Sequence, residues 1–261
     1  MPFFQSASND SIGLSVSMLP NEKVVAVYTA DLRANRMSFQ RNFDGLNYTA
    51  SMGGIYPLAN INIPKFISQL SVAGSTYLTL TRQNNAGSVE NVDFFADVFY
   101  DIQLTQDWVV RLGTGHSSQH LSDDAIIAGA SFKNYVKDYH QMQLVYKLAK
   151  HKLQSYAGVY YVYNFKTSSD ISKKLMWQFG WEHQPFKTVA FLRHLYYAGD
   201  IKFRQELNYA HTLNIQVGYK ISNEKSSIFR LAFDYSQGKD ERGYYMPAER
   251  NYAHIGIYFD F

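Results

Sequence analysis

The stretch with the clearest chemical potential is RLGTGHSSQHLSDDAI, residues 111–126, where two histidines flank a pair of serines and two aspartates follow. A histidine can take the proton of a serine hydroxyl and make it a nucleophile for acyl transfer, while a carboxylate orients the imidazole. The candidate catalytic residues are His116, Ser118, His120 and Asp123, with Ser117 and Asp124 as alternatives for the nucleophile and the carboxylate. One hypothesis is therefore a hydrolytic site.

Two other interpretations fit the same residues. His116, His120 and Asp123 are competent metal ligands by residue type. Alternatively, the stretch is a polar loop held by hydrogen bonds, in which Ser122 caps a short helix within DDAIIAGASF, residues 123–132, folded over a barrel mouth. The loop interpretation is favoured, because four residues of one loop need not converge as a nucleophile and a base on facing strands do.

The elements around this stretch are read from alternation along the chain, which is strict in the last segment, NYAHIGIYFDF. One face of it carries Ala253, Ile255, Ile257, Phe259 and Phe261, and the other carries Tyr252, His254, Gly256, Tyr258 and Asp260. This two-residue period indicates a β-strand with one apolar face. A final strand that ends on phenylalanine resembles the terminal signal of bacterial outer-membrane barrels.

Similar alternation predicts about twelve strands, most of them long enough to cross a bilayer when tilted. Their expected ranges are 36–42, 45–56, 69–83, 91–104, 108–118, 138–148, 152–165, 173–183, 187–198, 203–221, 226–237 and 250–261. We expect an all-β fold, an antiparallel transmembrane outer-membrane β-barrel over residues 36–261. Residues 1–35 are expected to form an N-terminal periplasmic segment or plug. The soluble alternative is a β-sandwich or lipocalin-like barrel, whose polar face would point outward.

Connection lengths give an independent indication. If the last strand ends in the periplasm, the links at 105–107, 149–151, 184–186 and 222–225 are periplasmic and short, while the links at 84–90, 119–137, 166–172, 199–202 and 238–249 are extracellular and mostly longer. This asymmetry is typical of outer-membrane barrels. The link expected at 57–68 is a long exception on the periplasmic side, and its two prolines argue against a central strand.

Composition supports the membrane interpretation. Aromatic residues make up 16% of the 261 residues, which suits a barrel with aromatic girdles. The net charge of +3 comes from scattered basic residues, so nucleic-acid binding is not expected. Cysteine is absent, which excludes disulfides and thiolate metal sites. No signal peptide is visible, and we expect that it has been removed from a mature chain.

Inside the barrel, charged residues are expected to meet across two neighbouring strands. A short turn at 105–107 would place Asp101 opposite Arg111, and both would face inward. The favoured interpretation is an ion pair that satisfies two lumen charges. The alternative is a ligand or selectivity element in which Asp93, Asp97 and Asp101 form an acidic row with Arg111 opposite.

The histidine and serine stretch also resembles a segment of a family of uncharacterised bacterial outer-membrane proteins, a domain of unknown function with the pattern His-x-Ser-Ser-His-Leu-Gly-Asp-Glu. The residues that match are His116, Ser118, His120, Leu121 and Asp123, while Gln119, Ser122 and Asp124 depart from it. Three further pieces are similar in the same order: ADLR at 30–33, NYVKD at 134–138 and DERGYY at 240–245. The resemblance implies the fold and the outer-membrane location but no activity.

Two functions follow as hypotheses. The first is a narrow solute-binding or channel barrel, or an accessory subunit of an outer-membrane assembly. The alternative is a lipid- or envelope-modifying hydrolase that uses the His116–Asp124 segment at the outer rim, and an enzyme is the less favoured of the two. No cofactor is expected. The expected partners are outer-membrane lipid, lipopolysaccharide and other outer-membrane proteins.

Overall fold

A computed structural model describes residues 13–43, 47–63, 66–83, 86–130, 135–166, 174–186, 189, 191–221, 227–242 and 248–261. The strands are β1 (Ser15–Met18), β2 (Met37–Asn42), β3 (Asn47–Ile63), β4 (Phe66–Gln83), β5 (Ala86–Gln103), β6 (Trp108–Leu121), β7 (Tyr135–Leu148), β8 (Leu153–Lys166), β9 (Leu175–His183), β10 (Leu195–Arg204), β11 (Ala210–Lys220), β12 (Ile228–Lys239) and β13 (Glu249–Asp260). The α-helix is α1 (Asp123–Ile127), and single 3₁₀ turns occupy Ala149–His151, Leu192–His194 and Gln205–Leu207. In the described part of the chain, no helix combines the length and apolarity needed to cross a membrane.

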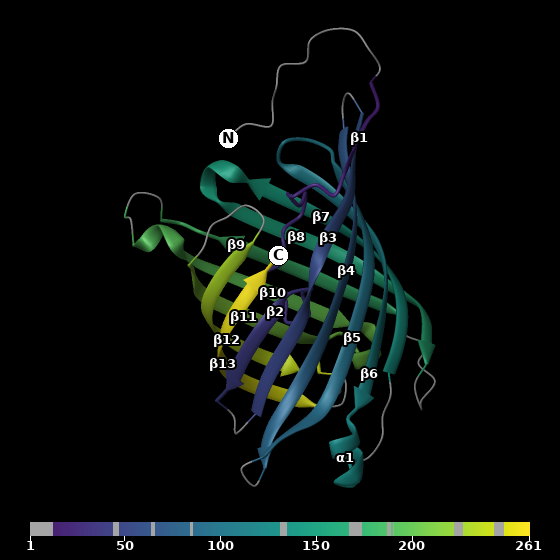
Figure 1. Ribbon diagram of the computed structural model, residues 1–261, viewed down its shortest axis with the longest axis vertical. Helices are drawn as coiled ribbons and strands as arrows, with labels where there is room; N and C mark the ends of the chain where they lie inside the picture. The colour runs from purple at the N-terminus through teal and green to yellow at the C-terminus, as the bar shows by residue number, and fades with distance from the viewer. Residues whose placement is uncertain are drawn as a thin grey trace.

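The sheet closes on itself. From β2 to β13, each strand pairs antiparallel with the next along the chain, and β13 pairs with β2 to complete a barrel of twelve strands. The short β1 adds to the end of β3 outside this circuit. In Figure 1 the protruding β3–β4 hairpin and β1 lie at one end, and α1 lies at the other, which we call the α1 end. The predicted twelve-strand antiparallel barrel is therefore confirmed.

The faces of the barrel decide between the membrane and soluble interpretations. Many large apolar side chains are exposed on its outer face, among them Phe39, Phe94, Val98, Leu112, Trp177, Phe179, Ile215, Val217, Leu231, Phe233, Ile255 and Ile257. Polar and charged side chains are buried inside, among them Gln69, Gln143, Gln178, Asn214, Gln216, Arg230 and Asp234. An apolar exterior around a polar interior is the pattern of a membrane barrel and the reverse of a soluble one.

The chain before β2 lies within the lumen. Val25 and Tyr28 pack with the inward side chains of β6, β7 and β8, and the Tyr28 ring stacks on Tyr156 with their centroids 3.7 Å apart. Ala30 packs against Tyr196 and Tyr258 on the other side of the lumen. Below, residues 23–36 are called the lumen segment.

The link predicted at 57–68 is wrong. Strands β3 and β4 continue to Ile63 and from Phe66, so they form one long hairpin. Pro57 lies at a register shift between Pro57 and Ala59, where a β-bulge removes the need for its missing N–H. The addition of β1 opposite Ala59–Asn62 supplies a second partner to this part of β3.

The strands predicted at 187–198 and 203–221, and the links at 184–186 and 199–202, are also misplaced. Strand β10 runs from Leu195 to Arg204, and the turn that follows ends at Asn208 and Tyr209, both with positive φ. Gly199 lies in mid-strand because the Trp181 indole covers it: a β-carbon there would lie 3.0 Å from Trp181 Nε1. Of the expected strand at 187–198, residues 187, 188 and 190 lie outside the described residues.

Candidate outer-face catalytic site

Strand β6 presents two different sets of side chains to its two sides. Its alternation continues without a bulge as far as Leu121, so His116, Ser118 and His120 point outward. Arg111, Ser117 and Gln119 lie on the inward face and are buried. Residues 111–121 of the predicted loop are therefore part of a strand.

His116 forms a hydrogen bond with a carboxylate of the next strand. Asp138 lies directly opposite His116 in the β6–β7 register, and its Oδ1 is 2.6 Å from His116 Nδ1. The other carboxylate oxygen of Asp138 accepts a hydrogen bond of 2.6 Å from Asn164 Nδ2 on β8. The imidazole, at 48% exposed, is thus held by a carboxylate that is itself held in place.

A local irregularity aligns these three residues. Asp138 pairs with Asn164, but the next residue, Tyr139, pairs with Val162, so Tyr163 is an extra residue on β8. Such a bulge re-aims the side chains beside it and is common near active sites. As a result, neighbouring strands β6, β7 and β8 each supply one member of a row of His116, Asp138 and Asn164.

Ser118 lies two residues from His116 on the same outward face. Side chains at this spacing are separated by about 6.6 Å along a strand, which an imidazole can largely span. Among the described residues, the Ser118 hydroxyl has no hydrogen-bond partner. Because Nδ1 of His116 is occupied by Asp138, Nε2 is the ring nitrogen available to a serine hydroxyl.

The other predicted site residues do not join this row. The His120 ring packs against Phe94, with centroids 6.0 Å apart. Asp124 accepts a hydrogen bond of 3.1 Å from Val89 N, and Asp123 begins α1, which Ser122 caps as predicted by accepting from Ala125 N. The prediction that Asp123 or Asp124 orients the imidazole is therefore wrong. Within the described ranges, no group of three or more His, Cys, Asp or Glu residues is placed to hold a metal ion.

Asp138 and Asn164 were missed by sequence reasoning. Asp138 ends the NYVKD piece that resembles the family pattern, and this was a signal for it. Its register with His116 could not be derived, because the connection between β6 and β7 is long and fixes no pairing. The position of Asn164 opposite Asp138 depends on the bulge in β8, and no residue type in the sequence indicates that bulge.

The predicted ion pair in the lumen is confirmed. Asp101 and Arg111 are opposite each other in the β5–β6 register. Arg111 Nε donates to Asp101 Oδ1 at 2.7 Å and its Nη2 donates to Asp101 Oδ2 at 2.8 Å. The guanidinium also lies over the Phe99 ring, 4.3 Å from its centroid. This bidentate pair is almost completely buried.

The remaining residues of the acidic row contact the lumen segment. Asp93 lies 2.7 Å from Arg33 Nη2 and is fully buried. Asp97 accepts hydrogen bonds from Tyr139 Oη at 2.8 Å and from Asn35 Nδ2 at 3.1 Å. Both carboxylates therefore help to anchor the lumen segment, and a role of the acidic row in binding a ligand stays a prediction.

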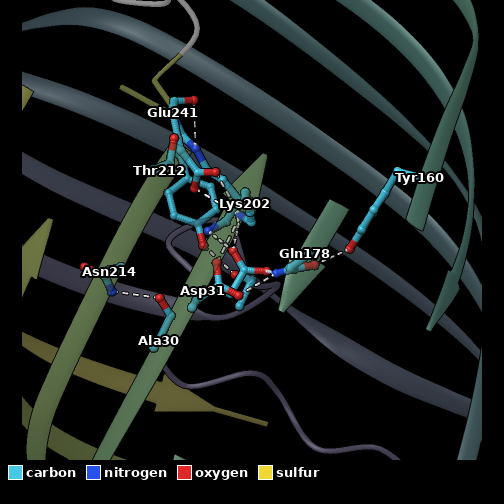
Figure 2. Close-up of polar contacts among 12 residues, drawn as sticks. Ala30, Asp31, Tyr160, Gln178, Lys202, Thr212, Asn214 and Glu241 are labelled. Atoms are coloured by element: carbon cyan, nitrogen blue, oxygen red, sulfur yellow. Dashed lines mark hydrogen bonds and ion pairs between the residues drawn. The ribbon is translucent and has the colours of Figure 1, made fainter. Parts of the chain in front are cut away.

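A second cluster anchors the turn of the lumen segment (Figure 2). Lys202 Nζ lies 2.6 Å from Asp31 and 3.0 Å from Glu241, and Gln178 donates to Asp31 at 3.0 Å. Beside Glu241, Asp240 is buried, which alone would raise the pKa of its carboxyl, but hydrogen bonds and charge from Arg242 hold that pKa below its usual value. Charged groups from three parts of the chain therefore meet inside the barrel.

The pattern of the family described as "Protein of unknown function (DUF1207)" matches residues 4–261, almost the whole chain. The chain belongs to this DUF1207 family. Of the three further pieces that resemble the family pattern, DERGYY extends beyond the described residues at 243–245, and NYVKD begins at 134, which is also outside them. Among curated proteins, none matches this sequence.

Solved structures share the fold of this DUF1207 protein. Outer membrane phospholipase A from Escherichia coli aligns with a TM-score of 0.56 and 13% identity, covering 86% of this chain and 88% of that one. The Salmonella typhi outer membrane phospholipase dimer with bound calcium gives 0.57 and 12%, with 86% and 88% covered. The KdgM porin gives 0.50 and 9%, with 86% and 98% covered. These likenesses are to outer-membrane barrels, and they show that this chain has the same β-barrel fold.

Proposed function

We propose that this barrel hydrolyses acyl esters of membrane lipids at the outer face of β6–β8. The observation that carries the proposal is the contact of 2.6 Å between His116 Nδ1 and Asp138 Oδ1, with Ser118 on the same outward face. Serine, histidine and a buttressed carboxylate are the parts that an acyl-transfer site needs. Buried lumen residues need such pairing for stability, whereas a half-exposed outer-face histidine does not.

The chemistry follows from these positions. His116 Nε2 takes the proton of Ser118 Oγ as that oxygen attacks the ester carbonyl, and Asp138 stabilises the imidazolium that forms. The tetrahedral intermediate collapses, the alcohol leaves with the proton from His116, and the fatty acyl group remains on Ser118. A water molecule, deprotonated by His116, then attacks the acyl-enzyme, and His116 returns the proton to Ser118 Oγ as the fatty acid leaves.

The position of the site in the bilayer suits lipid esters. His116 is eight residues from Trp108, whose ring packs with Tyr146 at the opposite end of the barrel from α1, with centroids 4.7 Å apart. At about 3.3 Å per residue and a tilt of about 40°, eight residues rise about 20 Å. The apolar band of such barrels is about 25 Å tall, so His116 lies near the second interface, where ester groups of outer-leaflet lipids lie.

The substrate class is therefore an acyl ester of a phospholipid or of lipopolysaccharide. The structures of similar fold include two outer-membrane phospholipases, so this architecture is compatible with such an activity. We include lipopolysaccharide because it is an acylated lipid at the same interface. Association with other outer-membrane proteins stays a prediction.

The test is fatty-acid release by the purified, refolded barrel from mixed micelles of diacyl phosphatidylcholine, and separately from lipopolysaccharide. The wild type is expected to release fatty acid, and Ser118→Ala and His116→Ala are each expected to lower the rate at least about 1000-fold. The matched control is Ser117→Ala, which removes the adjacent hydroxyl on the inward face and should keep the rate within about twofold. No release from either substrate, or full activity of Ser118→Ala, would refute the proposal.

Solute conduction is supported less by the geometry. The lumen segment crosses the interior and is held by the Arg33–Asp93 and Lys202–Asp31 ion pairs. Passage would require that these buried pairs break. In this proposal the lumen segment acts as an internal plug, and the division of the chain into residues 1–35 and a barrel at 36–261 stays a prediction.

A further inference from the structure

A cavity lies in the half of the lumen nearest the α1 end, and the lumen segment bounds it on one side. Its volume is about 160 Å³, and its lining includes Asp31, Arg33 and Asn35 as one wall. Side chains near the ends of the strands form its rim, among them Gln119, Lys137 and Glu206. This space can hold on the order of ten water molecules or one small solute.

Two of the cations that line this cavity are paired with carboxylates that also line it. Lys137 Nζ lies 2.5 Å from Glu206 Oε1, and Lys202 lies between Asp31 and Glu241. An added ion would have to compete with these internal partners for them. These five paired groups are therefore poor sites for an added ion.

Neutral polar groups in the cavity, in contrast, keep unused hydrogen-bonding capacity. Gln119 is 8% exposed, and its Oε1 atom is buried with no hydrogen-bond partner. Ser117, two residues before it on the inward face, is 5% exposed and also lines the cavity. Buried carbonyl groups in native proteins normally accept a hydrogen bond. We therefore expect the Gln119 oxygen to accept one from a ligand hydroxyl or from a water molecule.

Aromatic rings complete the wall. Tyr139 and Tyr160 line the cavity with their ring centroids 5.8 Å apart, and Phe95 lines it from β5. Rings offer apolar faces to the C–H groups of a solute, while the amide and hydroxyl groups bind its hydroxyls. Pockets that combine apolar walls with a few polar groups are typical of small-molecule sites.

We propose that this cavity binds a small neutral polyhydroxyl solute of monosaccharide size, with Gln119 Oε1 accepting a hydrogen bond from one of its hydroxyls. The site is separate from the proposed hydrolytic site, although both use β6. The side chains of Ser117 and Gln119 point into the lumen, and those of His116 and Ser118 point to the outer face. Neither proposal depends on the other.

The test is isothermal titration calorimetry of the full-length barrel in detergent with three probes of equal size: glucose, glucuronate and glucosamine. Glucose is expected to bind with at least tenfold higher affinity than either charged sugar. Gln119→Leu is expected to lower the glucose affinity at least tenfold. The matched control, Gln154→Leu, makes the same change on β8 at the opposite end of the barrel and should leave binding unchanged.

Each other outcome overturns the proposal. These outcomes are no glucose binding, tighter binding of glucuronate or glucosamine, and unchanged glucose affinity in Gln119→Leu. Heat-modifiable migration on a gel reports whether each variant is folded. If Gln119→Leu does not fold, Ser117→Phe fills the cavity from the neighbouring inward position and must abolish glucose binding. Lipid hydrolysis by wild type is scored separately, so its absence leaves this test intact.

Discussion

Asp138 gives the His116 imidazole a defined orientation, and it does so from a different strand. A histidine exposed at the outer face would otherwise sample several rotamers, with either ring nitrogen toward Ser118. The contact at 2.6 Å fixes Nδ1 on the carboxylate, and Asn164 holds the second carboxylate oxygen. At the residue scale, the proposed activity therefore depends on two side chains that never touch the substrate.

Replacing this carboxylate should lower activity without removing the nucleophile. Asp138→Asn is expected to lower kcat by about 100- to 10,000-fold, because the amide favours the wrong imidazole tautomer and cannot stabilise an imidazolium. Asn164→Ala should cost about tenfold, the effect of losing one hydrogen bond to a charged group, about 1.5 kcal/mol. The rate of fatty-acid release measures the effect of both substitutions. Asp107→Asn, the same type of change in the turn between β5 and β6, is the control and should leave the rate unchanged. Equal activities for all four proteins would contradict the proposed role of Asp138.

The sequence identified part of this site and missed the rest for a physical reason. His116 and Ser118 were found because residue type and spacing within one strand are local properties. Asp123 and Asp124 were chosen because they are close in sequence, yet they belong to α1 and its hydrogen bonds. A partner on a facing strand depends on register, and register across a long connection is set by the whole sheet.

At the scale of elements, the lumen segment is held by buried ion pairs, among them Arg33–Asp93 and Lys202–Asp31. Breaking a buried pair by removing one partner typically costs about 3–5 kcal/mol, since the other charge stays buried. Lys202 is the clearest case, because both Asp31 and Glu241 depend on it. These contacts tie the lumen segment to β10 and to the connection after β12.

Lys202→Met is therefore expected to lower the free energy of unfolding by about 3–5 kcal/mol, measured by urea titration with tryptophan fluorescence. Lys239→Met provides the control: its partner, Glu249, is 78% exposed, so the loss should stay below about 1 kcal/mol. The double change Lys202→Met with Asp31→Asn should recover part of the loss. If both single variants are equally stable, the lumen ion pairs do not anchor the segment.

Strand order and strand faces could be predicted from sequence, because alternation is a local signal with a period of two residues. The boundaries near Pro57 and Gly199 could not. A proline is tolerated where a bulge removes the need for its N–H, and a glycine suits mid-strand where an indole covers it. Both depend on neighbours in the sheet and not on the residue alone.

At the scale of the whole molecule, the lumen segment fills part of the interior, and the proposed activity lies on the outer face. The lumen holds the chain before β2, and the proposed chemistry is placed on the lipid-facing surface of β6–β8 (Figure 1). The same strand, β6, separates the two through its alternating side chains. The proposed functions therefore depend on side chains of the outward and inward faces of the strands, and not on passage of a solute through the barrel.

The wild-type protein is accordingly expected to give no steady conductance in planar bilayers. Deletion of residues 1–36 removes the lumen segment while leaving every strand from Met37 onward, and this variant should conduct. Heat-modifiable migration on a gel is the control that the shortened barrel has folded. Steady conductance through the wild type would show that the lumen segment does not close the barrel.

The most direct test of the outer-face serine is covalent labelling with an alkyl fluorophosphonate, followed by mass spectrometry of the peptide that contains residues 111–126. Ser117 and Ser118 are adjacent but lie on opposite faces of β6, so the labelled residue reports which face is reactive. One adduct is expected on Ser118, lost in His116→Ala and Ser118→Ala and retained in Ser117→Ala. An adduct on Ser117, or no adduct on folded wild-type protein, would contradict the proposed role of Ser118.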